Sequence, residues 1–342
     1  MAPPMTVLDA AMADAIAYSS LALSLSRPNP AVGALIIADD GTEISRGHTQ
    51  RAGEAHAEVM ALRAAGEAAR GATAVVTLEP CNHTGRTGPC AVALIEAGVR
   101  RVVYAVADPN PTASGGADRL RAAGVEVIDA VGEAAARSGP LRGWLFRQQY
   151  GRPLVTAKIA ATLDGRIAAP DGTSQWITGG VARARAHRQR AEIDAIIVGT
   201  GTVLADDPAL TARLPDGSLS DRQPIRVAMG HREIPDGAAI SRPFGEFRHV
   251  HTHDPEQVLA ALDDTTWVLV EGGPRIIGAF LDAGLVDEVE AYLAPTVLGA
   301  GASAVHSDAV TTLSDATRLR LDGIERLGDD ILLTCRSPRL PN

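Results

Sequence analysis

The sequence is poor in cysteine and aromatic residues and has no long hydrophobic run. Among its 342 residues, three are cysteines and 3% are aromatic. A membrane-spanning helix needs about 18 or more consecutive apolar residues. No such run occurs, so we expect no membrane partner. The first residues, MAPPMTVLDAAMADAIA, lack the basic start and apolar centre of a secretory signal, so we expect a cytoplasmic protein.

Few cysteines in a long chain suggest a reducing compartment, where paired thiols are more often metal ligands or catalytic groups than disulfides. A disulfide between Cys81 and Cys90 is therefore the weaker interpretation. Cys335 lies inside the apolar segment ILLTC (331–335), and we expect it to pack in a core.

Basic charge is also scarce. The chain has 32 lysines and arginines against 41 aspartates and glutamates, a formal net charge of −9, and no basic stripe. Binding to a nucleic-acid backbone needs such a stripe, and base stacking needs aromatic side chains. We therefore expect no nucleic-acid partner. A small anionic substrate needs only a few local arginines and remains compatible with the composition.

Apolar strand patterns alternate with helix patterns along the first part of the chain. Strands are predicted at 32–38, 73–78 and 101–107, and helices at 56–69 and 90–98. A further helix pattern covers residues 6–25. Such alternation indicates an α/β fold built in layers.

The alternation is interrupted where Gly151-Arg152-Pro153 predicts a turn and a new strand pattern begins near Leu154. We place a domain boundary near residue 148, which gives a first domain over 1–148 and a second over 149–342. The second part again alternates strand patterns, such as DAIIVG, PIRVAM, TWVLV and EVEAYL, with helix patterns.

Four polar residues of the first part form a candidate metal site. His56 and Glu58 open a predicted helix, Cys81 follows a predicted strand, and Cys90 opens the next helix. One His and two Cys can bind zinc and leave a fourth position for water. Glu58 is placed to carry protons, and H-x-E with a later Pro-Cys is typical of zinc deaminases. The alternative is that His56 and Glu58 are only polar residues at the start of a helix, and that the two cysteines are unrelated thiols of the core.

Several motifs around this site resemble the bifunctional deaminase/reductases of riboflavin biosynthesis. They are PNPAVGALI (28–36), HAEVMAL (56–62), TLEPCNHTGRTGPC (77–90) and DPNP (108–111). The resemblance runs from about Ser26 to the C-terminus. It implies a cytidine-deaminase-like three-layer domain followed by a dihydrofolate-reductase-like α/β domain.

The chain departs from the family pattern at two places. Gly88 stands where the family usually has proline, and Ser114-Gly115-Gly116 replaces a G-x-G. Asn29, between two prolines, either hydrogen-bonds the substrate or only forms a turn. The loop 82–89, with Arg86, either contacts the substrate or only connects two elements.

Two glycine-rich strand ends mark the second part. GTGTVLADDP (199–208) follows one strand pattern, and Glu271-Gly272-Gly273-Pro274 follows another. No G-x-G-x-x-G motif is present. Adjacent glycines let backbone N–H groups approach a phosphate, so two such ends favour a dinucleotide site over plain turns.

The resemblance assigns roles to residues of the second part. It implies NADPH binding by Ala160, Trp176, Thr202, Asp206, Gly273, Pro274, Arg275, Ile276, Ile277, Gly278 and Ala279. It implies substrate binding by Ser174, Arg190, Leu210, Arg213 and Glu271. A guanidinium suits a phosphate because it forms paired hydrogen bonds. Lys158 and Asp164 lie in the segment AKIAATLDG, next to the strand end of this second site. We expect both to influence the substrate.

The resemblance implies two reactions on small phosphorylated pyrimidines, with Zn²⁺ and NADPH as cofactors. The first is hydrolytic deamination of 2,5-diamino-6-(5-phosphoribosylamino)pyrimidin-4-one, with Glu58 as the catalytic proton carrier. The second is reduction of the ribosyl chain of the deaminated product to ribityl. We also expect a homo-oligomer.

Two alternatives remain open. One is a zinc deaminase of another nucleoside or of nucleic acid that retains one activity, and the other is a regulatory protein with a structural zinc.

Three alternating histidines, His249, His251 and His253, have no assigned role. On a strand they would face one side and could bind a metal. A solvated edge strand is the simpler interpretation.

Overall fold

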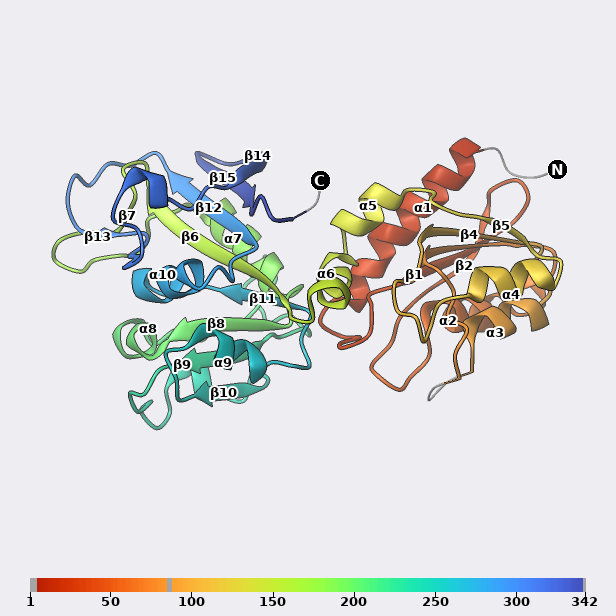
Figure 1. Cartoon of the computed structure of the whole chain (residues 1–342), viewed down its shortest axis with the longest axis horizontal. Coiled ribbons are helices and arrows are strands. Elements are labelled where there is room, and N and C mark those ends of the chain that lie inside the picture. Colours follow the sequence, from red (N-terminus) through yellow and green to blue (C-terminus); the bar gives the residue numbers. More distant parts are fainter. Residues whose placement is uncertain (1–4, 85–87, 341–342) are drawn as a thin grey trace. The chain divides into compact units, whose positions relative to one another are not determined.

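The computed structural model describes residues 5–84 and 88–340. The chain divides into two compact units, Met1–Gly151 and Arg152–Asn342 (Figure 1). The division falls at the predicted turn, where Gly151 ends helix α6 with a left-handed φ of 71°. None of the helices in the described ranges is long and apolar enough to cross a membrane.

The first unit is built on a five-stranded sheet with the order β2-β1-β3-β4-β5. β3, β4 and β5 run parallel, while β1 is antiparallel to both of its neighbours. The strands are β1 (Gly33–Ile37), β2 (Glu43–His48), β3 (Thr73–Leu78), β4 (Arg101–Val106) and β5 (Glu126–Ile128).

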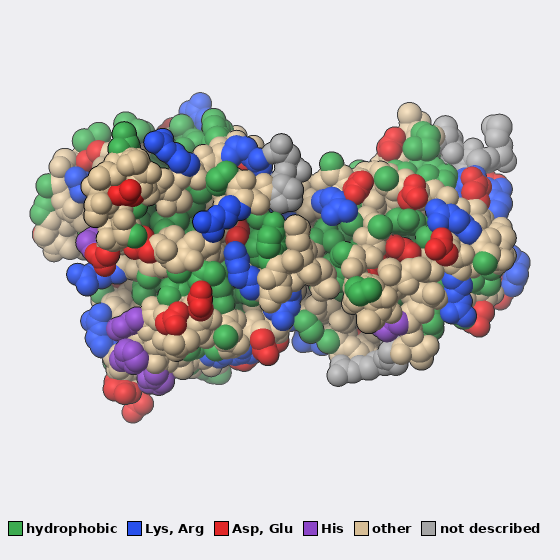
Figure 2. Space-filling view, in the orientation of Figure 1, with side chains coloured by type: hydrophobic (Ala, Val, Ile, Leu, Met, Phe, Trp, Pro, Cys, Tyr) green, Lys and Arg blue, Asp and Glu red, His purple; other side chains and the backbone are tan. Residues whose placement is uncertain are grey.

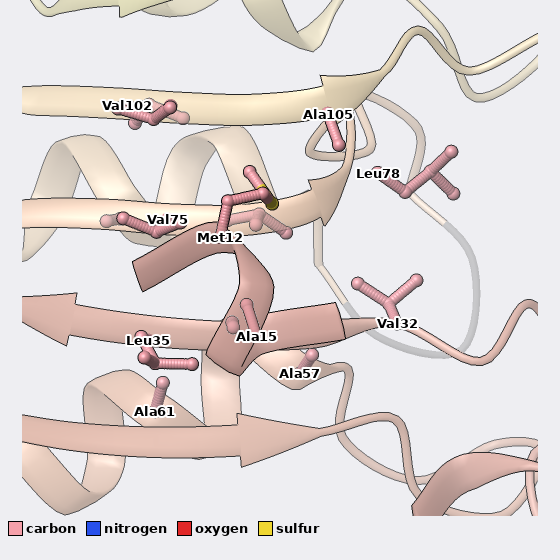
Figure 3. Close-up of a cluster of buried hydrophobic side chains, with 14 of the residues drawn as sticks. Met12, Ala15, Val32, Leu35, Ala57, Ala61, Val75, Leu78, Val102 and Ala105 are labelled. Carbon is pink, nitrogen blue, oxygen red and sulfur yellow. The ribbon is translucent and has the colours of Figure 1, made fainter. Parts of the chain in front are cut away.

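Helices cover both faces of this sheet and make three layers. Figure 3 shows α1 on one face, with Met12 and Ala15 over the strands, and Ala57 and Ala61 of α2 on the other. Val, Ile, Leu and Ala fill both sides because the central strands are buried on two faces. The helices are α1 (Met5–Ser19), α2 (Ala57–Ala65), α3 (Cys90–Glu96), α4 (Gly116–Ala122), α5 (Glu133–Ser138) and α6 (Arg142–Tyr150).

The second unit contains an eight-stranded sheet with the order β10-β9-β8-β11-β6-β12-β15-β14. The strands from β10 to β12 run parallel, and β15 and β14 add an antiparallel end. The strands are β6 (Leu154–Thr162), β8 (Ala195–Gly199), β9 (Ile225–Met229), β10 (Phe247–Val250), β11 (Trp267–Val270), β12 (Glu288–Ala294), β14 (Arg320–Leu327) and β15 (Asp330–Arg336). A small ribbon joins β7 (Arg166–Ala168) to β13 (Ala302–Ser303).

Four helices accompany this sheet: α7 (Gly180–Arg190), α8 (Thr200–Asp206), α9 (Pro255–Ala260) and α10 (Pro274–Asp282). Phe280 of α10 and Val258 of α9 join the main apolar core, and Cys335 packs against it as predicted. α7 contributes Ala182 to a separate small cluster with Tyr292, Leu327 and Leu332.

Most of the predicted elements are confirmed, and two predictions are wrong in detail. The helix predicted at 6–25 ends at Ser19, because only one 3-10 turn (Ser20–Ala22) follows before Leu23 leaves the helical conformation with a ψ of 140°. The glycine-rich strand end at 199–208 follows β8 as expected and continues directly into α8. β10 ends at Val250, so His251 and His253 lie outside the expected edge strand.

Candidate active sites in the two units

Three metal-ligand side chains meet at one end of the first sheet. His56 precedes α2, Cys81 follows β3, and Cys90 begins α3. Nδ1 of His56 lies 3.7 Å from Sγ of Cys81 and 3.3 Å from Sγ of Cys90. The three ligand atoms lie within 4.8 Å of one another, and the ranges that the structure describes contain no second group of three such ligands.

The spacing and chemistry of these donor atoms fit zinc. In a tetrahedral site with Zn–S near 2.3 Å and Zn–N near 2.0 Å, neighbouring ligand atoms are about 3.5 Å apart. Both measured distances to Nδ1 are close to that value. Thiolate and imidazole donors suit zinc, and three protein ligands leave the fourth position that a catalytic site needs.

The two thiols differ in protonation. The Cys90 thiol donates a hydrogen bond to Cys81 and, together with His56, lowers the pKa of Cys81 to about 4. The same interaction, followed by burial, raises the pKa of Cys90. Cys81 is therefore held as the thiolate that binds metal, and metal binding would release the proton of Cys90.

Glu58 lines a cavity of about 260 Å³ beside this centre, together with His56 and Cys81. Its side chain is buried, with 4% of the residue exposed. Burial, followed by the negative charge of Cys81, raises the pKa of Glu58 to about 7. A carboxyl group with a pKa near neutrality can both accept and release a proton, as general acid–base catalysis requires.

Asn29 lines the same cavity, so the structure places this predicted residue beside the metal ligands. Asp108 and Asn110 of the DPNP segment also line it, although neither had an individual role in the sequence-based prediction. Burial raises the pKa of Asp108. Of the predicted contact loop 82–89, residues 85–87, including Arg86, lie outside the described residues.

Glu79 is a structural residue of this site that the sequence did not reveal. It is 8% exposed, and its carboxylate accepts hydrogen bonds from the backbone N–H groups of Asp108, Gly115 and Ala117 at 3.0–3.2 Å. Glu79 thus ties the segment 108–117 to the end of β3, next to Cys81. Glu79 belongs to the motif TLEPC, but its role could not be predicted from the sequence. Its hydrogen-bond partners are backbone N–H groups, which leave no pattern of side chains.

The two glycine-rich strand ends of the second unit come together in one cavity of about 720 Å³. Gly199–Thr202 after β8 and Gly273–Ile276 after β11 both line it. His231, Arg232, His253 and His306 also line this cavity, and sequence reasoning missed their place there. His231 and His253 stack edge to face, with ring centroids 4.9 Å apart; Figure 2 shows histidines gathered on this unit.

The residues predicted to bind NADPH fall into two groups. Those that line the cavity are Thr202, Gly273, Pro274, Arg275, Ile276 and Ala279. Those outside its lining are Ala160, Trp176, Asp206, Ile277 and Gly278. Ile277 is buried in the core at 3% exposure. A Cβ on Gly278 would lie 1.7 Å from the carbonyl oxygen of His306, so that position requires glycine for packing.

The residues predicted to bind substrate centre on an ion cluster. Oε1 of Glu271 lies 2.9 Å from Nζ of Lys158 and 2.7 Å from a guanidinium nitrogen of Arg190. Burial alone would raise the pKa of Glu271, but the charges of Arg190 and Lys158 outweigh it and hold that pKa well below its usual range.

Arg190 also donates to the carbonyl oxygen of Thr211, next to Leu210. Arg213 is exposed and donates to the carbonyl oxygen of Gly217, and Ser174 is half-buried. Asp164 instead accepts hydrogen bonds from the N–H groups of Leu298 and Gly299, and so anchors a neighbouring loop.

Comparisons with known proteins match both units. Residues 5–106 match the cytidine and deoxycytidylate deaminase zinc-binding region, and residues 153–333 match the RibD C-terminal domain. Riboflavin biosynthesis protein RibD of Mycobacterium tuberculosis (strain H37Rv) is 51% identical over 327 residues, 96% of each chain. The same protein of Escherichia coli (strain K12) is 40% identical over 361 residues, 94% of this chain and 97% of the relative.

Solved structures agree over nearly the whole length. Acinetobacter baumannii RibD, form 1, has a TM-score of 0.86 and 36% identity, covering 98% of this chain and 100% of that one. A diaminohydroxyphosphoribosylaminopyrimidine deaminase/5-amino-6-(5-phosphoribosylamino)uracil reductase of Thermotoga maritima has a TM-score of 0.85 and 32% identity, covering 97% and 99%.

The fold and the two sites define an enzyme in which a zinc-binding deaminase is joined to a reductase. The chain belongs to the RibD family of bifunctional deaminase/reductases of riboflavin biosynthesis. The predicted fold class is therefore confirmed, a cytidine-deaminase-like domain followed by a dihydrofolate-reductase-like α/β domain. The predicted hydrolase and oxidoreductase activities and the cofactors zinc and NADPH are confirmed with it.

Proposed function

We propose that the first domain, residues 1–148, deaminates 2,5-diamino-6-(5-phosphoribosylamino)pyrimidin-4-one. The second, residues 149–342, then reduces the ribosyl chain of 5-amino-6-(5-phosphoribosylamino)uracil with NADPH. The observation that carries the proposal is the meeting of His56, Cys81 and Cys90 within 4.8 Å, beside a cavity that Glu58 lines. The solved relative from Thermotoga maritima bears both activities in its name.

In the first reaction, His56, Cys81 and Cys90 would hold the zinc ion. The metal would supply the Lewis acidity that makes a water molecule nucleophilic at neutral pH. Glu58 accepts the proton of that water and passes it to the departing ammonia, since its pKa of about 7 suits both steps. Asn29, Asp108 and Asn110 line the cavity and would orient the pyrimidine ring.

In the second reaction, NADPH would occupy the cavity between the two glycine-rich strand ends and supply the hydride. Of the residues assigned to the cofactor, those that line this cavity and would contact it there are Thr202, Gly273, Pro274, Arg275, Ile276 and Ala279. Ala160, Trp176, Asp206, Ile277 and Gly278 were also assigned and lie outside the lining. Backbone N–H groups at the start of α10 suit the pyrophosphate, because this helix end carries partial positive charge.

The substrate of the second reaction would bind at the Glu271–Arg190–Lys158 cluster. Ser174, Arg190, Leu210, Arg213 and Glu271 are the residues assigned to it. The guanidinium groups of Arg190 and Arg213 would recognise the phosphate through paired hydrogen bonds. Lys158 neutralises Glu271 at 2.9 Å and so sets the charge of the site.

We further propose a cytoplasmic homo-oligomer that acts on small phosphorylated pyrimidines and not on nucleic acid. β14 is an edge strand, and its Leu321 and Ile324 are 54% and 66% exposed. Exposed apolar side chains on a sheet edge favour association. Sedimentation of the purified chain tests this, since a monomer at micromolar concentration would contradict it. The net charge of −9 opposes binding to nucleic acid.

Metal analysis tests the first site. Purified protein should contain about one zinc per chain, and chelation should abolish ammonia release while NADPH oxidation on the deaminated substrate continues. Cys81→Ser should lose the metal, whereas Cys335→Ser should retain it, because Cys335 packs in the second core. A metal-free chain with full deaminase activity would contradict the proposal.

A further inference from the structure

One face of α7 holds two segments that carry proposed ligand-binding residues. Arg183, His187 and Arg190 are spaced four and three residues apart and so share this face. Arg183 donates to the carbonyl oxygen of Thr178 at 2.6 Å, and its guanidinium lies 4.7 Å from the ring centroid of Trp176. His187 and Arg190 both contact the carbonyl oxygen of Thr211. α7 therefore fixes the segments 176–178 and 207–213 at once.

The segment 207–213 has an unusual backbone. Asp207 has a φ of 39° and Leu210 a φ of 52°. A branched residue such as leucine adopts the left-handed region only when its surroundings enforce it, because Cβ crowds the backbone there. Leu210 is also buried, at 5% exposure. The segment needs strong contacts on both sides to keep this shape.

Those contacts are hydrogen bonds on each side of Leu210, made by the side chain of Asp207 before it and by the backbone of Thr211 and Ala212 after it. Asp207 accepts a hydrogen bond from the N–H of Ala239 at 2.7 Å. Gln223 accepts from the N–H of Ala212 at 2.9 Å and donates to its carbonyl oxygen at 2.8 Å. His187 contacts the residue directly after Leu210, with Nδ1 3.1 Å from the carbonyl oxygen of Thr211.

The direction of the His187 hydrogen bond is fixed by chemistry. A carbonyl oxygen can only accept, so Nδ1 of His187 carries the proton. Burial, followed by the charge of Arg190, lowers the pKa of His187. The ring is thus neutral near pH 7 and protonated at Nδ1, a form that donates steadily to Thr211.

We propose that His187 is a positioning residue of the reductase reaction, which fixes the Thr211 carbonyl and thereby presents Leu210 and Arg213 to the phosphorylated ribosyl substrate. The inference rests on the proposed function of the second unit. It predicts an effect on substrate binding and little on NADPH, because the hydrogen bond of His187 reaches Thr211, between the substrate-assigned Leu210 and Arg213.

Three variants of His187 separate this role from general stability. His187→Leu removes the donor, and His187→Gln places an amide near the position of Nε2. His187→Asn keeps an N–H donor near the position of Nδ1 and should rescue. The matched control is Arg188→Gln, since Arg188 is the next residue of α7 and is exposed. Steady-state assays would use 5-amino-6-(5-phosphoribosylamino)uracil and NADPH.

We expect His187→Leu and His187→Gln to raise KM for the uracil substrate about fivefold, as loss of one ordinary hydrogen bond would. The KM for NADPH and the kcat should change less than about twofold, and His187→Asn and the control should resemble the wild type. An unchanged KM in His187→Leu, or an asparagine variant as impaired as the leucine variant, would overturn the proposal. If wild-type protein fails to oxidise NADPH with this substrate, the proposed function itself is wrong.

Discussion

At the scale of single residues, two glutamates with little exposure have opposite acidities. Glu58 stands in a cavity beside a thiolate, and its pKa rises to about 7. Glu271 stands between Arg190 and Lys158, and its pKa falls well below the usual range. The raised pKa of Glu58 suits a proton carrier, whereas the lowered pKa of Glu271 suits a permanently charged group. Residue type alone does not distinguish these roles.

Replacing Glu58 by glutamine tests its role as proton carrier. The variant should keep its zinc, because Glu58 is not among the three clustered ligands. Ammonia release should fall at least about 100-fold, the usual contribution of general acid–base catalysis. NADPH oxidation on the deaminated substrate should continue at the wild-type rate. Deamination at an undiminished rate would show that another group carries the proton.

The same variant makes a pH-dependent prediction for metal-free protein. Folding raises the pKa of Glu58 from about 4.3 to about 7, so ionisation opposes folding. The penalty is absent below about pH 4, grows between the two pKa values and is constant above about pH 7.

Glu58→Gln should therefore match the wild type in free energy of unfolding at pH 4 and exceed it by about 3 kcal/mol at pH 8. Denaturant titrations of chelated protein at both pH values measure this. An equal difference at the two pH values would contradict the raised pKa.

At the scale of elements, the sequence predicted strands and helices where apolar patterns are strong. The strand at 73–78 is confirmed to the residue, because β3 is buried on both faces. β2 (Glu43–His48) and β14 (Arg320–Leu327) were missed, since both are edge strands with mixed polar faces. The three zinc ligands could be predicted because each follows a strand or begins a helix. The contacts of Glu79 and His187 could not, because their partners are distant backbone groups.

The junction of the segment 108–117 with Pro80 shows why one glycine matters and another does not. A Cβ on Gly116 would lie 1.7 Å from the carbonyl oxygen of Pro80, which precedes the ligand Cys81. A Cβ on Gly88 would meet no atom of the described residues within 4 Å. Gly116, in the segment Ser114-Gly115-Gly116, is therefore part of the packing. Gly88 leaves room for a side chain.

Gly116→Ala should lower the free energy of unfolding by about 2 kcal/mol or more, as overpacking does, and weaken zinc retention. Gly88→Ala is the matched control and should change stability by less than about 0.5 kcal/mol. Thermal melts and zinc release to a colorimetric chelator measure both effects. Equal behaviour of the two variants would refute the packing argument.

At the scale of the whole molecule, each unit has a core of its own. The large cluster of the first unit runs from Leu8 to Trp144, and that of the second from Val155 to Val289. Each unit exceeds about 150 residues, a length at which a single core can support a stable fold.

Expressing residues 1–151 and 152–342 separately should divide the activities. The first fragment should bind zinc and release ammonia, and the second should oxidise NADPH only with deaminated substrate, both within about tenfold of the full chain because each keeps its own core. Circular dichroism melts establish that each fragment folds. A folded second fragment that released ammonia would contradict the assignment of domains.

The order of the two reactions in the intact chain is the most direct test. The full protein receives 2,5-diamino-6-(5-phosphoribosylamino)pyrimidin-4-one and NADPH, while ammonia and the absorbance of NADPH are followed together. We predict that ammonia appears first, that NADPH oxidation follows after a lag, and that the two reach equal amounts. Oxidation of NADPH without ammonia, or ammonia with no later oxidation, would contradict the account.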